Sequence, residues 1–333
     1  MRIVFSPDGD YAMTITSYKH AEIVYYKPGG AESEFEPAIG FTNATPDGFQ
    51  RLLLELDDSN LDADEIAKGL DARAIGFFMI IKTKSGWHAI TRAGGTGGGV
   101  AALAAMLTEW GLCDEGYARL TEIRAKSKLP FTQILRVHGK HREPDIVVKR
   151  WTPPITPWER TVMELYARHA RFEVSATRLA HNCPSFVPAI TKEQIESGRE
   201  AHAAAQEWLR GIGAAVEVPI ELRFGSVTLR GQADAVLDDG REALVIEYKS
   251  TEQAAKDPAA KQQAAIYAAM YAAVHGVPTA PALLAGGRIV WSDGHIAPSE
   301  ARWKLVRRIG KAWAARNARC DRCALKWCRW RKG

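Results

Sequence analysis

The sequence has no long apolar segment and very little cysteine. No apolar run approaches the roughly 20 residues that a helix needs to cross a bilayer. The first ten residues, MRIVFSPDGD, lack the basic and apolar regions of a signal peptide. We therefore expect a cytoplasmic protein with no membrane contact. Only five of the 333 residues are cysteines, and closely spaced thiols in a cytosolic protein are expected to bind metal rather than form disulfides.

The rest of the composition is that of a soluble globular protein, with 46% hydrophobic and 25% charged residues. The net charge of +5 is unevenly placed. Residues 1–150 carry 18 Lys and Arg against 20 Asp and Glu, whereas residues 151–333 carry 26 against 19. Residues 301–333 hold 12 basic residues and one acid. This asymmetry predicts that the C-terminal region faces a polyanion.

The length allows two modest domains. We predict an N-terminal α+β domain of unknown role over 1–150, a linker and connecting helix over 151–170, and a second domain over 171–333. In the first, Thr45-Pro46 predicts a helix reaching about Leu56. A glycine-rich loop at 94–99 lacks the Gly-Lys-Ser/Thr ending of a phosphate-binding loop, so a flexible turn is favoured.

The stretch from Val227 to Lys249 predicts a β-hairpin. Its two halves alternate apolar and polar residues around Asp239-Gly240, which favours a two-residue turn. With that turn, Asp234 lies opposite Val245 and diagonal to Glu247 on one face. Glu247 and Lys249 share this face because strand side chains alternate.

Two carboxylates and a lysine therefore converge at one end of a sheet. Burying them without a counter-ion is costly, so the pattern favours a hard divalent cation, Mg²⁺ or Mn²⁺. The alternative is a solvated hairpin with ordinary salt bridges, and the charge pattern alone favours this alternative, because surface hairpins often carry such residues.

The order of Asp234 and Glu247-Tyr248-Lys249 resembles the PD-(D/E)xK nuclease signature. The surroundings resemble the RecB-like exonuclease branch, in which a His precedes the sheet and Gln-x-x-x-Tyr follows it. Here these residues are His202, on a helix predicted to run to about Arg210, and Gln263 with Tyr267. The latter two lie on a helix predicted to start at Asp257-Pro258 and to end near His275, with Gly276 past its end. The resemblance implies catalytic roles for Asp234, Glu247, Lys249, Gln263 and Tyr267, and metal binding by His202, Asp234, Glu247 and the Tyr248 carbonyl.

Each of these assignments has an alternative from the residues themselves. His202 falls on the apolar face of its helix, where a core histidine is the other interpretation. An imidazole ligand favours Mn²⁺, with Mg²⁺ still open. Gln263 and Tyr267 lie one turn apart, which also fits a polar pair on an amphipathic helix.

Four cysteines form a candidate metal-binding set: Cys183, Cys320, Cys323 and Cys328. Four thiolates suit Zn²⁺ or a [4Fe–4S] cluster, and their spacing does not separate the two. One Cys before the core and three after it is similar to the iron–sulfur members of the RecB-like branch. That resemblance implies a [4Fe–4S] cluster with a structural role.

The resemblance covers about 171–333 and implies an α+β or α/β fold: a restriction-endonuclease-like core, with a central mixed sheet flanked by helices. It is similar to CRISPR-associated RecB-like exonucleases and AddB-type nuclease domains. The implied activity is metal-dependent hydrolysis of DNA, with single-stranded DNA or frayed ends as substrate, in CRISPR adaptation, recombination, repair or replication, and with protein partners. Expected DNA contacts, interleaved with tryptophans, are Arg307, Arg308, Arg316, Arg322 and Arg329.

A rival prediction is a nucleic-acid-binding accessory subunit that no longer cuts. The intact set of predicted ligands favours the enzyme over this rival. Another places the function in residues 1–150, with the nuclease-like half serving a partner complex.

Overall fold

The computed structural model describes residues 2–5, 11–28, 38–57, 60–127, 129–138, 146–184, 186–189, 191–313 and 323. The chain forms two compact units, and the boundary between them falls between Phe172 and Glu173. None of the helices in these ranges is long and apolar enough to cross a bilayer.

The first unit contains antiparallel strands in two sets. One set has the order β1-β2-β3-β4-β8, and in the other β9, β6, β7 and β5 follow one another. The strands of the first set are β1 (Arg2–Phe5), β2 (Tyr11–Tyr18), β3 (Ala21–Pro28), β4 (Ala38–Thr42) and β8 (Ile134–His138). Those of the second are β5 (Gln50–Asp57), β6 (Phe77–Lys82), β7 (Gly86–Gly95) and β9 (Val147–Trp151), and the start of β10 (Arg171–Ser175) pairs with β9 in parallel.

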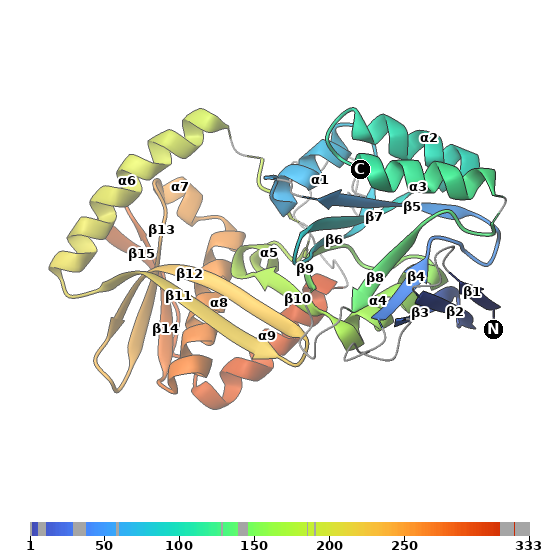
Figure 1. Cartoon of the computed structure of the whole chain (residues 1–333). Coiled ribbons are helices and arrows are strands. Elements are labelled where there is room, and N and C mark those ends of the chain that lie inside the picture. Colours follow the sequence, from blue (N-terminus) through green and yellow to red (C-terminus); the bar gives the residue numbers. More distant parts are fainter. Residues whose placement is uncertain are drawn as a thin grey trace. The chain divides into compact units, whose positions relative to one another are not determined.

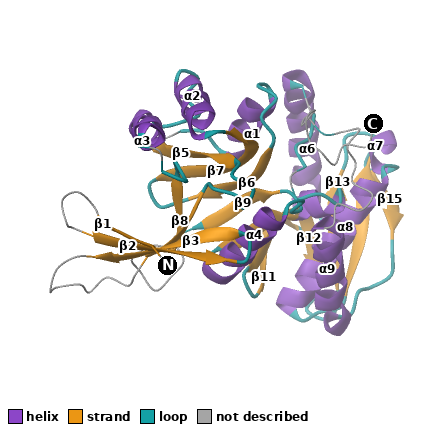
Figure 2. Ribbon diagram, turned by 90° about the vertical axis from the view of Figure 1, so that its right-hand side faces the viewer, coloured by secondary structure: helices purple, strands orange, loops and turns teal. Residues whose placement is uncertain are grey.

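Four helices of the first unit have side-chain N-caps that satisfy free backbone N–H groups. They are α1 (Ala63–Asp71), α2 (Gly97–Thr108), α3 (Glu115–Lys126) and α4 (Pro157–His169). Asp62 and Glu65 form a reciprocal capping box at α1. Segment 94–99 is not the predicted flexible turn: Gly94 and Gly95 end β7, and Gly97 begins α2. Between them, the Thr96 hydroxyl accepts from Gly99 N at 3.3 Å. Figure 2 shows α2 and α3 side by side next to β5 and β7.

The predicted helix from Pro46 to Leu56 is wrong. The segment forms a turn followed by strand β5. Gly48 has a φ of +81°, and its N–H donates to Thr45 O at 3.0 Å, which closes the turn. Leu52, Leu53 and Leu54 are all fully buried in β5. Consecutive residues of a strand point to opposite sides, so this run needs cover on both faces of the sheet.

The second unit is built on a mixed sheet with the order β11-β12-β13-β14-β15. β13 and β14 are parallel, and the other neighbouring pairs are antiparallel. The strands are β11 (Ala215–Phe224), β12 (Val227–Asp238), β13 (Ala243–Tyr248), β14 (Thr279–Ala285) and β15 (Arg288–Ser292). The helices are α5 (Ala176–Ala180), α6 (Lys192–Gly211), α7 (Glu252–Ala255), α8 (Pro258–His275) and α9 (Pro298–Trp313).

Helices pack against both faces of this sheet, as alternate residues of β14 show. Ala282 and Leu284 pack in one cluster with Leu209 of α6. Leu283 packs in another with Ala264 of α8. Helix α9 runs alongside α8 (Figure 1). A mixed sheet flanked by helices confirms the predicted α+β class.

Helix α8 begins and ends as predicted. The Asp257 carboxylate accepts from Ala259 N at 3.0 Å, and Pro258 is the first helical residue. Gly276 ends the helix in the left-handed region with a φ of +74°, which glycine adopts without a steric cost. The parallel pair β13 and β14 needs a long crossover, and α8 provides it.

Candidate active site

The predicted hairpin is formed by β12 and β13, but its turn is longer than predicted. Asp238 pairs with Ala243 rather than with Arg241, which leaves a loop of four residues. The Asp239 carboxylate accepts from Arg241 N at 2.8 Å and from Glu242 N at 2.9 Å. These side-chain bonds stabilise the wider loop in place of a two-residue turn.

The longer turn moves the register by two residues. Asp234 does not lie opposite Val245 as predicted, because the last pair of the ladder is Ala235 with Ile246. One step further, the same register places Asp234 opposite Glu247. A register shift of two residues keeps every side chain on the same face of the sheet. Asp234 and Glu247 therefore still lie on one face, as predicted.

At this position of the ladder, a β13 backbone N–H donates to the Asp234 carboxylate instead of to a backbone carbonyl. Its Oδ2 accepts from Tyr248 N at 2.6 Å. Its Oδ1 lies 3.0 Å from His202 Nε2, which α6 brings to this end of the sheet. The His202 ring also meets the Tyr248 ring edge-on, with centroids 5.7 Å apart. The structure therefore joins three of the predicted metal-binding residues.

Glu247 is nearly inaccessible, with 4% of its side chain exposed. Lys249 Nζ donates to Glu247 Oε1 at 2.7 Å. The other oxygen, Oε2, accepts no hydrogen bond from any residue that the structure describes. Burial raises the pKa of Glu247 to about 7, against the opposing effect of Lys249.

A buried carboxylate oxygen without a donor is costly unless a cation binds it. Asp234 and His202 lie near enough to influence the Glu247 carboxyl group electrostatically. Carboxylate oxygens and an imidazole nitrogen are donors that suit Mg²⁺ or Mn²⁺. The residues present therefore fit a divalent cation.

Sequence analysis missed Glu217, which lies in β11 beside these residues. Ligand atoms of His202, Glu217 and Asp234 all lie within 4.8 Å of one another. The flanking pairs of the β11–β12 ladder place Glu217 opposite Asp234. The amides of Gln206 and Gln232 each donate to one Glu217 carboxylate oxygen.

Gln263 and Tyr267 lie one turn apart on α8 and contact each other. Gln263 Nε2 donates to Tyr267 Oη and to Thr177 Oγ1, each at 3.4 Å. Tyr267 is buried, and burial raises its pKa to about 12. Its ring packs on Gly231 so closely that a Cβ there would lie 2.3 Å from Tyr267 Cε1. Their predicted catalytic role stays a prediction.

The predicted cysteine set is described only in part. Cys183 is buried and Cys323 is half-buried, whereas Cys320 and Cys328 lie outside the described residues. An isolated antiparallel bridge pairs Cys323 with Pro188. Cys323 therefore lies beside the segment that follows Cys183.

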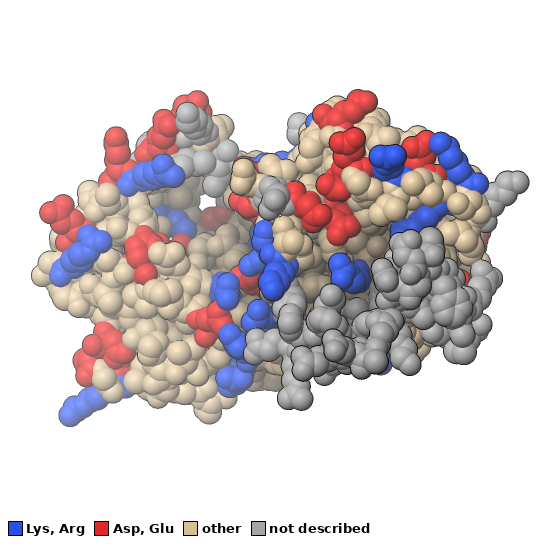
Figure 3. Space-filling view, viewed as in Figure 1, with Lys and Arg blue, Asp and Glu red and all other residues tan. Residues whose placement is uncertain are grey.

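Two of the predicted DNA-contacting arginines are described. Arg307 is exposed and lies over the Trp303 ring, 5.9 Å from its centroid. Arg308 is half-buried, and its Nη1 donates to Asn182 Oδ1 at 3.0 Å. Arg316, Arg322 and Arg329 lie outside the described residues. Basic side chains gather around α9 and the neighbouring ends of β11 and β12 (Figure 3).

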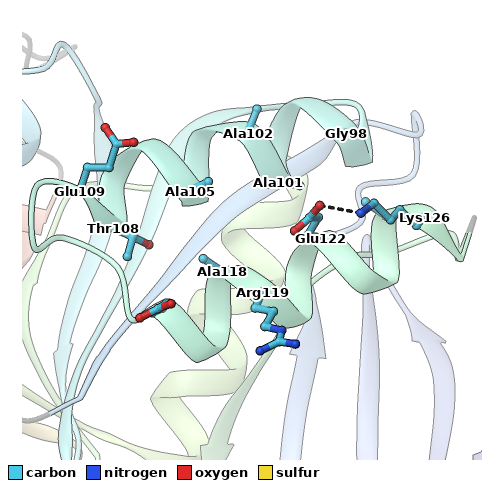
Figure 4. A pocket seen from close by; sticks show the side chains of 12 residues that line it. Gly98, Ala101, Ala102, Ala105, Thr108, Glu109, Ala118, Arg119, Glu122 and Lys126 are labelled. Atoms are coloured by element: carbon cyan, nitrogen blue, oxygen red, sulfur yellow. Dashed lines mark hydrogen bonds and ion pairs between the residues drawn. The ribbon is translucent and has the colours of Figure 1, made fainter.

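A groove of about 960 Å³ lies between α2 and α3 in the first unit (Figure 4). Alanine side chains form much of its walls, and Glu122 and Lys126 at its edge pair with each other at 2.7 Å. It lacks the converging polar groups of an active site, and none of the predicted site residues lines it.

Of the comparisons with known proteins, one identifies a family. The family model described as PD-(D/E)XK nuclease superfamily matches residues 156–329. No curated protein matches the chain. The chain is similar to a solved structure titled "Crystal structure of SSO0001", with 18% identity and a TM-score of 0.31, over 49% of this chain and 90% of that one. The family assignment therefore depends on the family model.

Proposed function

The chain belongs to the PD-(D/E)XK nuclease superfamily, and from this premise we propose that it is a metal-dependent deoxyribonuclease. The superfamily's members are nucleases that use divalent metals such as Mg²⁺ or Mn²⁺. The observation that carries the proposal is the Glu247 carboxylate, buried with one oxygen bound to Lys249 and the other without a donor among the described residues.

In the proposed mechanism, His202, Asp234, Glu247 and the Tyr248 carbonyl would hold the cation. When bound, a divalent cation offsets negative charge on the phosphate and makes water a better nucleophile. Asp234 also accepts from Tyr248 N, which fixes the carboxylate and the start of the Glu247-to-Lys249 segment relative to each other.

Lys249 orients the attacking water and offsets charge that develops on the phosphate oxygens. Its ammonium group is directed by the 2.7 Å bond to Glu247 Oε1. We propose that Gln263 and Tyr267 hold the phosphate backbone of the strand. The raised pKa of Tyr267 keeps its hydroxyl protonated, and hence a hydrogen-bond donor, at neutral pH.

The direct test is cleavage of end-labelled DNA in Mg²⁺, Mn²⁺ or EDTA. Lys249→Ala should reduce cleavage at least about 100-fold and leave DNA binding nearly unchanged. Lys256→Ala is the matched control, because Lys256 is an exposed lysine of the same unit, and it should cut like the wild type. A folded wild-type protein that binds DNA and metal but does not cut would instead be a non-cleaving accessory subunit.

We further propose that the substrate is single-stranded DNA or frayed ends, degraded from a terminus. The support is the exposed Trp303, 62% accessible, stacked with Arg307 on α9: a ring for bases beside a cation for phosphates. A linear strand and a circle of the same sequence separate the possibilities. Cutting of the circle at a similar rate would establish an endonuclease.

We propose that Cys183, Cys320, Cys323 and Cys328 hold a structural [4Fe–4S] cluster, with Zn²⁺ as the alternative. The pairing of Cys323 with Pro188 supports a shared centre. Metal analysis of anaerobically purified protein decides between iron and zinc. Cys323→Ser should lose the metal and much of the stability. Cys113→Ser, which changes a buried thiol of the first unit, should retain the metal.

We place this activity in CRISPR adaptation, recombination, repair or replication, within a DNA-processing complex. Proteins that co-purify with the chain, and that alter its cleavage rate when added back, would identify that complex. A cleavage rate that no co-purifying protein changes would indicate an enzyme that acts alone.

A further inference from the structure

The two ring nitrogens of His202 face different partners. Nε2 lies 3.0 Å from Asp234 Oδ1. Nδ1 lies 3.0 Å from Gln206 Nε2 and 3.6 Å from Glu217 Oε1. The lone pairs of the two nitrogens diverge across the ring. A carboxylate beside Nδ1 therefore does not converge with Nε2 on one cation, although the ligand atoms of His202, Glu217 and Asp234 form a tight group.

The position of the ring proton depends on whether Nε2 binds a cation. With the Gln206 amide directed at Nδ1, the proton lies on Nε2 and is donated to Asp234. Nε2 binds a metal only without its proton, which must then lie on Nδ1. Glu217 Oε1 is the carboxylate oxygen on that side, at 3.6 Å. The Gln206 amide donates to this oxygen and also faces Nδ1, so this amide must turn away from Nδ1 for Glu217 to accept the proton.

The backbone of Glu217 also sets it apart from its neighbours in β11. It has a φ of +52° in the middle of the strand, whereas residues on both sides of it pair regularly with β12. A residue other than glycine with such a positive φ has a strained backbone, and the strain persists where surrounding contacts enforce it. The amides of Gln206 and Gln232, one on each carboxylate oxygen, are contacts of that kind.

We propose that Glu217 is the positioning residue of the metal ligand His202. Its carboxylate accepts the Nδ1 proton, which fixes the ring and presents the free Nε2 lone pair beside Asp234 Oδ1. Glu217 therefore acts through the imidazole and is not itself a ligand. The inference rests on the proposed metal-dependent function and names the group that supports its histidine.

The test measures metal binding rather than cleavage. Mn²⁺ is titrated calorimetrically into the full-length wild type, Glu217→Gln, Glu217→Gly and the control Glu221→Gln. Glu221 is in the same strand, and its carboxylate accepts from Arg223 and Arg230 instead. Both Glu217 variants should bind Mn²⁺ about 10- to 100-fold more weakly, and the control should bind like the wild type. Glu217→Gly should also unfold at a higher temperature than Glu217→Gln, because glycine relieves the strain.

A double-mutant cycle distinguishes positioning from direct ligation. If Glu217 acts through His202, adding Glu217→Gln to His202→Ala should weaken binding no further. Nitrogen chemical shifts of the imidazole, recorded with Mg²⁺, should show the proton on Nδ1 in the wild type and a loss of that preference in Glu217→Gln.

Additive losses would overturn the inference in favour of a direct ligand. Wild-type affinity in Glu217→Gln would overturn it outright. A wild-type protein that binds neither Mg²⁺ nor Mn²⁺ is a different result, because it contradicts the proposed function itself.

Discussion

The cost of burying the Glu247 carboxyl group depends on pH. Burial raises its pKa from an ordinary value of 4.5 to about 7. A raised carboxyl pKa means that the folded state holds the proton more tightly than the unfolded state. The contribution of Glu247 to stability without metal is therefore most favourable below about pH 4.5, falls as the pH rises to about 7, and is least favourable above that.

Glu247→Gln removes this titration. In EDTA, the free energy of unfolding of the variant relative to the wild type should rise by about 1–3 kcal/mol between pH 5 and pH 8. Denaturant titration at both pH values measures the change. Glu252→Gln serves as the control and should show no such trend, because Glu252 is exposed and pairs with Arg288, which stays charged between pH 5 and pH 8. A Glu247→Gln difference that is equal at both pH values would contradict the assignment.

Sequence motifs point to the residues of the candidate site with the exception of Glu217. Asp234, Glu247 and Lys249 could be found because their order along one hairpin forms a motif, and His202 because it precedes that hairpin on a helix. Glu217 falls on the same face of β11 as Glu221 and Arg223. In the sequence it therefore looks like an ordinary polar residue on the solvent face of a strand. What sets it apart is a backbone conformation and two glutamine contacts, which arise only when α6, β11 and β12 come together.

The contact between strand β12 and helix α8 depends on a glycine, which leaves room for an aromatic ring. Gly231 lies directly under the Tyr267 ring. Gly231→Ala should lower the free energy of unfolding by about 1–3 kcal/mol and reduce cleavage, because Tyr267 and its neighbour Gln263 must move. Calorimetry and the cleavage assay measure the two effects.

Gly198→Ala is the matched control for this substitution. A Cβ there meets nothing within 4 Å. Because alanine favours the helix over glycine, the free energy of unfolding should rise by up to about 1 kcal/mol. Equal stability of the two variants would show that the contact between Gly231 and Tyr267 does not limit the packing of α8.

Helix and strand signals were decisive where caps or alternation were clear, as in α8 and β12. They failed at β5, because Thr45-Pro46 has the residues of a helix start but begins a turn. The consecutive leucines that follow are equally compatible with a buried helix and with a strand covered on both faces. The hairpin loop failed for another reason. The sequence Asp-Gly favours a two-residue turn. Backbone N–H groups of the loop, however, donate to the carboxylates of Asp238 and Asp239, which stabilises the four-residue loop. These hydrogen bonds depend on side-chain geometry.

At the scale of the molecule, the excess of basic residues in 151–333, 26 against 19 acids, predicts DNA binding that weakens steeply with salt. Arg307→Ala should weaken binding of single-stranded DNA and lower the slope of log K against log [salt] by about 0.7. Arg119→Ala makes the same charge change on α3 of the first unit and should leave the slope unchanged. Fluorescence anisotropy at several salt concentrations measures both, and equal slopes in all three proteins would remove α9 from the DNA-binding surface.

The hydrogen bond from Tyr248 N to Asp234 Oδ2 makes one amide proton a built-in reporter. Its acceptor is a carboxylate that the proposed cation would share, so the electron density available to this proton changes whenever the cation arrives or leaves. The amide resonance of Tyr248 should therefore shift on Mg²⁺ addition in proportion to occupancy. This one backbone position then follows the loading of the site without a substrate, a dye or a mutation.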